Sequence, residues 1–192
     1  MEITDNEMRF MLLMFKSPET EYNANSISKK LGISSMGALK IARKLEKENI
    51  IISEEKGKAK FYSLNLENEY TRQYIKFLLK REAEQSPSYI KRWINEIKKI
   101  NNADCGILYG SLLKKGKNAE DIDLLLVTDN NKFSKLKKEL QDINEINIRK
   151  IHPMYQTKED IKNNIKKKDR PLLNALKGIV VFGEDVLMEV LE

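Results

Sequence analysis

Two carboxylates and a glycine-serine pair, residue types suited to phosphate and metal chemistry, lie close together in the second half of the chain. Between Gly106 and Val127, Gly110 and Ser111 follow a short apolar run, and Asp121 and Asp123 stand at the start of a second one. Because side chains alternate along a strand, the two aspartates point to one side, with their Cα atoms about 6.5 Å apart. That spacing suits carboxylates that hold the divalent ions of phosphoryl transfer. Mg²⁺ is the expected ion, because it favours hard oxygen ligands and completes its shell with water and phosphates.

Gly110 and Ser111 supply the phosphate-binding half of this motif. A glycine lets the backbone approach a phosphate closely, and the Ser111 hydroxyl can cap the following helix or bind a phosphate oxygen. An isolated Asp-x-Asp before an apolar strand more often caps or solvates the end of that strand, and this structural role is the alternative. The full combination of strand, Gly-Ser, helix-length gap, Asp-hydrophobic-Asp and second strand is more specific.

This combination resembles the nucleotidyltransferase superfamily typified by DNA polymerase β, especially its minimal members. The resemblance covers residues 102–192. It implies that Gly110 and Ser111 bind a nucleotide, and that Asp121 and Asp123 are catalytic residues and ligands of Mg²⁺. The segment from Lys177 to Asp185 is similar to the last short strand and turn of the minimal members.

The third strand of that fold is predicted from Glu145 to Ile151, where polar and apolar residues alternate. In active members, the resemblance implies, this strand carries a third carboxylate that serves the second metal ion and is the candidate base. Asn147 takes that place here, and a neutral amide is a poor metal ligand and cannot accept a proton. Glu145, two residues earlier, is the weaker substitute. This departure argues against catalysis and is compatible with binding of a nucleotide or of one metal ion.

Length and composition limit the class of protein. The 192 residues, 41% of them hydrophobic, can form one large or two small domains. No apolar run approaches the roughly 20 residues of a membrane helix, and the acidic start lacks the basic region of a signal peptide, so we expect a cytoplasmic protein without membrane contact. Cys105, the single cysteine, is expected to be a small core residue, and His152, the single histidine, is expected at a strand end.

Positive charge is concentrated near the N-terminus. The net charge is +6, and within residues 26–66 nine lysines and arginines face four glutamates, an excess of five. This uneven distribution indicates a surface that contacts nucleic acid.

The same region has the helical pattern of a helix-turn-helix. A first helix is predicted over residues 5–16. A short helix from Ile27 to Leu31 would be capped by Ser26 and ended by Gly32. A longer helix is predicted from Met36 to Asn49, with its apolar residues spaced to face inward.

A hairpin is predicted after these helices. Ile50 to Ile52 and Phe61 to Leu64 read as strands around a polar turn that contains Gly57. Together, residues 5–66 resemble the MarR- and ArsR-like winged helices. The resemblance implies that the second helix of the pair enters the major groove, and that the wing lysines, alternating onto one face, meet phosphates. The predicted DNA-binding residues are Ser35, Met36, Leu39, Lys40, Arg43, Lys56, Lys58 and Lys60. Ordinary solvated lysines and a protein-docking role are the alternatives, and Glu54 and Glu55 argue mildly against tight phosphate contact.

Residues 67–101 are predicted to form two helices with a break at Pro87. The apolar stripe that contains Trp93 would pack between domains or form a dimer interface. A homodimer is the expectation, because winged-helix regulators read paired half-sites as dimers. The predicted fold is therefore α+β, with a winged helix-turn-helix domain over 1–66, a helical linker over 67–101, and a nucleotidyltransferase-like mixed sheet flanked by helices over 102–192.

Two classes of function follow from these motifs. The first is a DNA-binding transcription regulator whose second domain is catalytically weakened and binds a nucleotide or a partner protein. The second is an active Mg²⁺-dependent nucleotidyltransferase that moves a nucleoside monophosphate onto a hydroxyl of a protein, an RNA or a small molecule, with an antitoxin role as a related alternative. The expected partners are double-stranded DNA, a nucleoside triphosphate and a protein.

Overall fold

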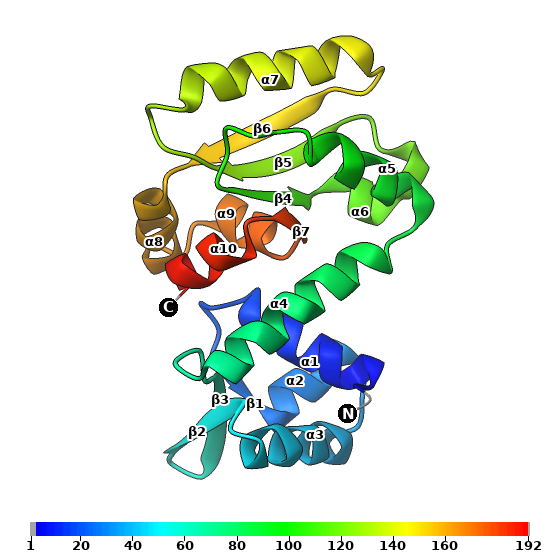
Figure 1. The fold of residues 1–192 in the computed structure, drawn as a ribbon. Helices are drawn as coiled ribbons and strands as arrows, with labels where there is room; N and C mark the ends of the chain where they lie inside the picture. The colour runs from blue at the N-terminus through cyan, green and yellow to red at the C-terminus, as the bar shows by residue number, and fades with distance from the viewer. Residues whose placement is uncertain (1–2, 192) are drawn as a thin grey trace. The chain divides into compact units, whose positions relative to one another are not determined.

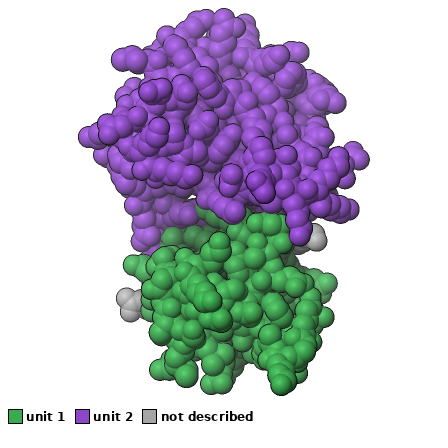
Figure 2. Space-filling view, turned by 180° about the vertical axis from the view of Figure 1, so that it is seen from behind, with its two compact units in different colours: residues 1–78 green, residues 79–192 purple. Residues whose placement is uncertain are grey.

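The computed structural model describes residues 3–191, and the chain divides between Leu78 and Leu79 into two compact units, coloured separately in Figure 2. Unit 1 holds a winged-helix-like region with a three-stranded antiparallel sheet, and unit 2 a mixed four-stranded sheet flanked by helices, which confirms the α+β prediction. No helix in the described part of the chain is long and apolar enough to cross a membrane.

Figure 1 shows the elements in order. Those of unit 1 are α1 (Asp5–Phe15), β1 (Tyr22–Asn23), α2 (Ala24–Leu31), α3 (Ser35–Lys47), β2 (Ile51–Lys56) and β3 (Ala59–Leu64). Helix α4 (Glu69–Glu84) runs across the division. Unit 2 continues with α5 (Ser88–Ile97), β4 (Cys105–Tyr109), α6 (Ser111–Lys115), the 3₁₀ turn η1 (Gly116–Asn118), β5 (Ile122–Val127), α7 (Phe133–Ile146), β6 (Ile151–Gln156), α8 (Lys158–Lys166), α9 (Arg170–Leu176), β7 (Ile179–Phe182) and α10 (Glu184–Leu191).

Side-chain caps fix the ends of the helix-turn-helix. Helix α2 begins at a capping box in which Asn23 and Ser26 bond each other's backbone N–H groups, at 2.8 and 3.0 Å. The prediction that Ser26 is the cap was therefore wrong by three residues, because Asn23 is the cap and Ser26 is the third residue of the helix. Gly32 ends α2 in the left-handed conformation with φ +68°, as predicted. Ser34 caps α3 by accepting a hydrogen bond from the N–H of Gly37.

A partly buried ion pair, between a buried glutamate and a half-exposed lysine, holds α1 against α3. Glu7 completes a capping box with Thr4 at the start of α1, and it also accepts a hydrogen bond of 2.5 Å from the Lys44 ammonium of α3. Burial alone would raise the pKa of Glu7, but the hydrogen bonds from Lys44 and Thr4 outweigh burial and lower the pKa below its ordinary value of 4.5. The ionised carboxylate therefore stabilises the packing of these two helices.

The sheet of unit 2 is ordered β6-β5-β4-β7, with β4 antiparallel to both neighbours and β5 parallel to β6. Helix α7 lies along β6 in Figure 1 and contributes Leu136, Leu140 and Ile143 to the core. Trp93 is buried in the same core, so its stripe packs within unit 2, and neither predicted role, packing between domains or a dimer interface, is correct.

Strand β6 is the outer strand next to β5, and two residues occupy its open side. The side-chain amide of Asn144 accepts a hydrogen bond of 2.7 Å from the N–H of Ile151 and donates one of 3.3 Å to its carbonyl oxygen. Pro153, two residues further along, has no N–H to offer. The predicted strand from Glu145 to Ile151 was wrong, because α7 continues through Ile146 and the strand begins only at Ile151.

Replacing Glu7 with glutamine is expected to lower the free energy of unfolding of unit 1 by about 2 kcal/mol at pH 7, the typical loss for a charged hydrogen bond. Since the folded-state pKa is lowered, this contribution is present above pH 4.5 and is lost as the pH falls through the folded-state value. Urea unfolding of both proteins at several pH values measures the difference. A Glu55→Gln change at an exposed site is the control. A wild type–variant gap that stays constant down to pH 3 would contradict this account of Glu7.

Candidate functional site

The register of β4 and β5 brings the glycine-serine turn to the aspartates. Tyr109, the last residue of β4, is the cross-strand partner of Asp123. The Ser111 N–H donates a hydrogen bond of 3.2 Å to Oδ2 of Asp123, and the Ser111 hydroxyl donates one of 3.4 Å to the carbonyl oxygen of Asp121. The four residues predicted from spacing are therefore gathered where β4 ends and β5 begins, at the edge of the sheet that is formed by strand ends.

Gly110 is the residue that makes this approach possible. Its backbone has φ +77° and ψ −141°, a conformation essentially confined to glycine. A Cβ atom at this position would lie 1.9 Å from Oδ2 of Asp123, well inside van der Waals contact. The absence of a side chain thus lets the Asp123 carboxylate reach the turn.

The sequence did not point to His152 as part of this edge. His152 pairs with Asp123 across the parallel β5–β6 register, and its Nε2 lies 3.8 Å from Oδ1 of Asp121. About half of each side chain is exposed, 60% for His152 and 49% for Asp121. A histidine therefore stands beside the two aspartates on the neighbouring strand, where solvent and ligands can reach it.

Asn147 lies away from this edge, and its predicted place on the third strand was wrong. It is the residue that follows α7, it is buried, and its amide donates a hydrogen bond of 2.9 Å to the carbonyl oxygen of Ile143. Its amide oxygen accepts from Arg92 at 3.3 Å, and its amide nitrogen donates to Glu96 at 3.4 Å. Asn147 therefore ties the end of α7 to α5. Glu145 lies on the exposed face of α7 and is not a substitute on that strand.

The donors at this edge suit one hard cation better than two. Among residues 3–191, no three histidine, cysteine, aspartate or glutamate side chains lie close enough together to hold a metal ion as they stand. Two carboxylates can hold one Mg²⁺ whose shell is completed by water and phosphate oxygens, whereas a pair of ions needs further carboxylate oxygens. Burial and then the charge of Asp123 raise the pKa of the neighbouring Tyr109, so its phenol is a neutral neighbour at pH 7.

Helix α3 presents a second candidate surface, in unit 1. Ala38, Ala42 and Leu45 are buried and anchor the helix. The opposite side carries exposed side chains spaced three or four residues apart, so they form one stripe along the helix. Its members are Met36, Lys40, Arg43 and Lys47, and the predicted DNA-binding residue Ser35 is exposed next to it.

The prediction that the wing lysines share one face was wrong. Lys56 is paired with Ala59 across the hairpin, and Lys60 follows Ala59 on β3, so the side chains of Lys56 and Lys60 point to opposite faces. The strand alternation does not continue through the turn at Gly57 and Lys58, which separates Lys56 from Lys60.

Two of the wing lysines are held by glutamates. Nζ of Lys56 lies 2.5 Å from a carboxylate oxygen of Glu21 and 3.5 Å from one of Glu54. Nζ of Lys60 lies 2.8 Å from a carboxylate oxygen of Glu46. The hydrogen bonds to Glu21 and to Glu46 raise the pKa of Lys56 and Lys60, respectively. Lys58 is exposed at the tip of the hairpin. The wing therefore offers fewer available cations than its sequence suggests.

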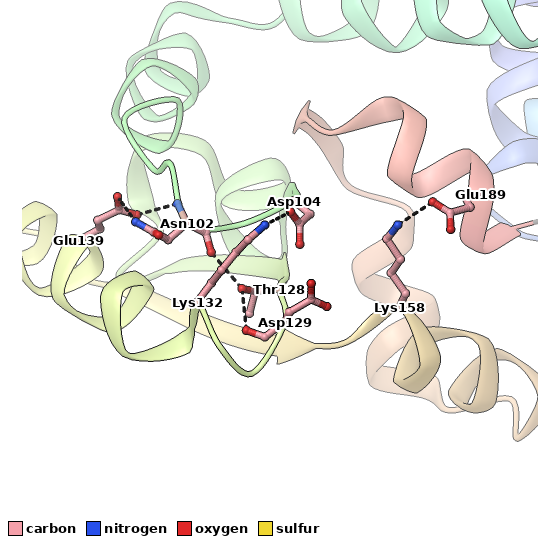
Figure 3. Close-up of polar contacts among 8 residues, drawn as sticks. All are labelled: Asn102, Asp104, Thr128, Asp129, Lys132, Glu139, Lys158 and Glu189. Atoms are coloured by element: carbon pink, nitrogen blue, oxygen red, sulfur yellow. Dashed lines mark hydrogen bonds and ion pairs between the residues drawn. The ribbon is translucent and has the colours of Figure 1, made fainter.

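A further polar cluster lies at the opposite end of the unit 2 sheet, where β4 begins and β5 ends (Figure 3). Lys132 donates a hydrogen bond of 2.6 Å to Asp104, and Lys158 of α8 donates one of 2.6 Å to Glu189. These bonds raise the pKa of both lysines. Because each lysine is bonded to a carboxylate of another segment, the cluster fastens the ends of these elements together.

Cys105 is buried at the start of β4, as predicted for a core residue. Desolvation raises the pKa of its thiol to about 12. The thiolate, which is the nucleophilic form, is therefore essentially absent at neutral pH.

No family model matches the chain, and no curated protein is significantly similar to it. Among solved structures, a mutant of ZitR from Lactococcus lactis is similar with a TM-score of 0.36 and 18% identity, covering 52% of this chain and 64% of that chain, less than two thirds of its length. Wild-type ZitR in complex with DNA gives a TM-score of 0.31 and 15% identity over 52% of this chain and 73% of that chain. The zinc-dependent MarR family transcriptional regulator AdcR, in its Zn(II)-bound state, gives 0.28 and 15% over 52% and 73%. The likeness to MarR-family regulators is thus distant, spans about half of this chain, and leaves unit 2 unidentified.

Replacing Gly110 with alanine is expected to destabilise unit 2 more than replacing Gly116. Gly116 has a similar backbone, with φ +58° and ψ −129°, but a Cβ there meets only the flexible end of Tyr89, at 3.3 Å. Both variants incur about 1–3 kcal/mol of backbone strain. Gly110→Ala loses about 1–3 kcal/mol more, because the new methyl group displaces Asp123. Urea denaturation of unit 2 measures both losses, and equal losses would show that the turn and Asp123 are not in close contact.

Proposed function

We propose that the protein is a DNA-binding transcription regulator and that α3 enters the major groove of double-stranded DNA. The observation that carries the proposal is the exposed stripe of α3, which presents Lys40, Arg43 and Lys47 on the second helix of a helix-turn-helix. Unlike Lys56 and Lys60, these three side chains are not held by a glutamate in the described structure. Cations on such a helix contact phosphates and base edges.

The DNA-bound form is proposed to be a homodimer that reads two half-sites. A single winged helix covers one half-site, and dimers of such domains bind two half-sites about one helical turn apart.

Replacing Lys40 and Arg43 together with glutamate is expected to weaken binding to duplex DNA at least tenfold at 0.1 M salt. The change also makes the logarithm of the affinity less steep against the logarithm of the salt concentration, because fewer counterions are released. Fluorescence anisotropy with a labelled genomic duplex measures both quantities.

The matched control exchanges Lys135 and Lys138, exposed lysines of α7, for glutamate. It changes the net charge by the same amount and leaves α3 intact. If the control weakens binding as much as the α3 variant, the effect comes from overall charge and the proposed placement of α3 fails.

A second proposed function concerns unit 2, which we propose binds a nucleoside triphosphate together with one Mg²⁺. The observation that favours it is the approach of the Gly110–Ser111 turn to Asp123, next to the exposed carboxylate of Asp121. Asp121 and Asp123 would hold the ion, and the turn would receive the phosphates, with Ser111 exchanging its bonds to the aspartates for bonds to a phosphate oxygen. The ion would supply charge neutralisation for the phosphates when bound.

This proposal describes a nucleotidyltransferase-like unit that is catalytically weakened. His152 stands at the cross-strand position beside Asp123, and imidazole suits Mg²⁺ far less than a carboxylate does. A nucleotide bound here would serve as an effector of the regulator. Active transfer of a nucleoside monophosphate, including the antitoxin role, is the alternative.

Replacing Asp121 and Asp123 with asparagine is expected to lower the affinity for ATP in the presence of Mg²⁺ at least tenfold, since both ligand charges are lost. Isothermal titration calorimetry measures the affinity with Mg²⁺ and with EDTA, and Asp142→Asn on the exposed face of α7 is the control. His152→Asp, which adds a carboxylate, is expected to strengthen the Mg²⁺ dependence. Undiminished binding by the double variant would exclude this site, and transfer of labelled nucleotide by the wild type would favour the active alternative.

A further inference from the structure

The two serines at the start of α3 form hydrogen bonds within the protein. Ser34 accepts the hydrogen bond of 3.0 Å that caps the helix, from the N–H of Gly37. The Ser35 hydroxyl lies 3.3 Å from that of Ser28, a buried serine of α2, within hydrogen-bonding distance. Gly37 has no side chain. Each of the two exposed serine hydroxyls of this turn thus already makes one bond inside the protein.

Met36 is the exception in this turn, because it is large, apolar and 60% exposed. An isolated exposed apolar residue is common on protein surfaces and by itself indicates nothing. Met36, however, heads the stripe that continues one and two turns later with Lys40 and Arg43. The stripe is thus apolar where the helix begins and cationic beyond that point.

In a helix-turn-helix, the first residues of the second helix contact base edges. The major groove presents hydrogen-bond donors and acceptors on every base pair, but the only apolar group among them is the C5-methyl of thymine. A methionine thioether chain donates no hydrogen bond, and it is flexible enough to adapt to an apolar neighbour.

We propose that Met36 determines DNA specificity by packing against a thymine methyl group in the major groove. The inference rests on the proposed insertion of α3 and adds the identity of the base that faces its first turn. Lys40 and Arg43 would supply the cationic contacts of the same helix, so affinity and base preference come from different residues of one stripe.

The test compares two duplexes that differ only in this methyl group, alternating dA-dT and alternating dA-dU, as competitors in fluorescence anisotropy at fixed salt. The full-length wild type is expected to bind the thymine duplex about fourfold more tightly, the gain for burying one methyl group. Met36→Ala is expected to bind both duplexes equally and to keep its salt dependence. Met36→Leu, which retains an apolar chain, is expected to keep the preference.

Ile148→Ala, at a fully exposed apolar residue of unit 2, is the matched control and should leave the preference unchanged. Equal affinity of the wild type for the two duplexes would overturn the role of Met36 and leave DNA binding intact. The same conclusion follows if Met36→Ala keeps the preference, since the preference would then reflect duplex shape. Lack of salt-sensitive binding to either duplex, by contrast, would overturn the proposed function itself.

Discussion

The antiparallel pairing of Tyr109 with Asp123 is the constraint on which the candidate site of unit 2 depends. The strand residues that lead away from this pair, Cys105 to Leu108 of β4 and Leu124 to Val127 of β5, are buried and paired in one register, so a slip would disrupt their packing. With the register fixed, the turn after β4 must meet the carboxylate of Asp123, and a residue larger than glycine does not fit at position 110. Core packing thus sets the geometry of the polar edge.

The local part of this site could be predicted from the sequence. Gly110 and Ser111 directly follow β4, and Asp121 and Asp123 stand at the start of β5, so the pairing of these two neighbouring strands brings all four residues together. The third strand could not be placed in the same way. Leu136, Leu140, Ile143 and Asn147 are buried at helical spacing, and this period continues into the stretch whose alternation indicated a strand. The true strand carries His152 and Pro153, which are weak strand signals, so the neighbour of Asp123 was missed.

In unit 1 the helices were predictable, but the availability of their charges was not. Caps such as Ser34 and Gly32 act within one turn and leave a readable pattern. The glutamate that holds Lys44 is 37 residues away in sequence, and the one that holds Lys56 is 35 residues away. Only the fold reveals which lysines remain available for a ligand, and this is why α3 carries more of the proposed DNA contact than the wing does.

Strand β6 is one of the two outer strands of the unit 2 sheet, and its open side bears on self-association. An open strand edge normally invites another chain to add a strand and can seed amyloid-like growth. Asn144 of α7 already bonds both backbone groups of Ile151 on β6, and Pro153 of β6 has no N–H to donate. The exposed Ile146 and Ile148 lie three to five residues before this strand, and next to an unpaired strand edge they would favour aggregation. Asn144 and Pro153 therefore hinder another chain from pairing with the backbone of β6, next to two exposed isoleucines that favour association.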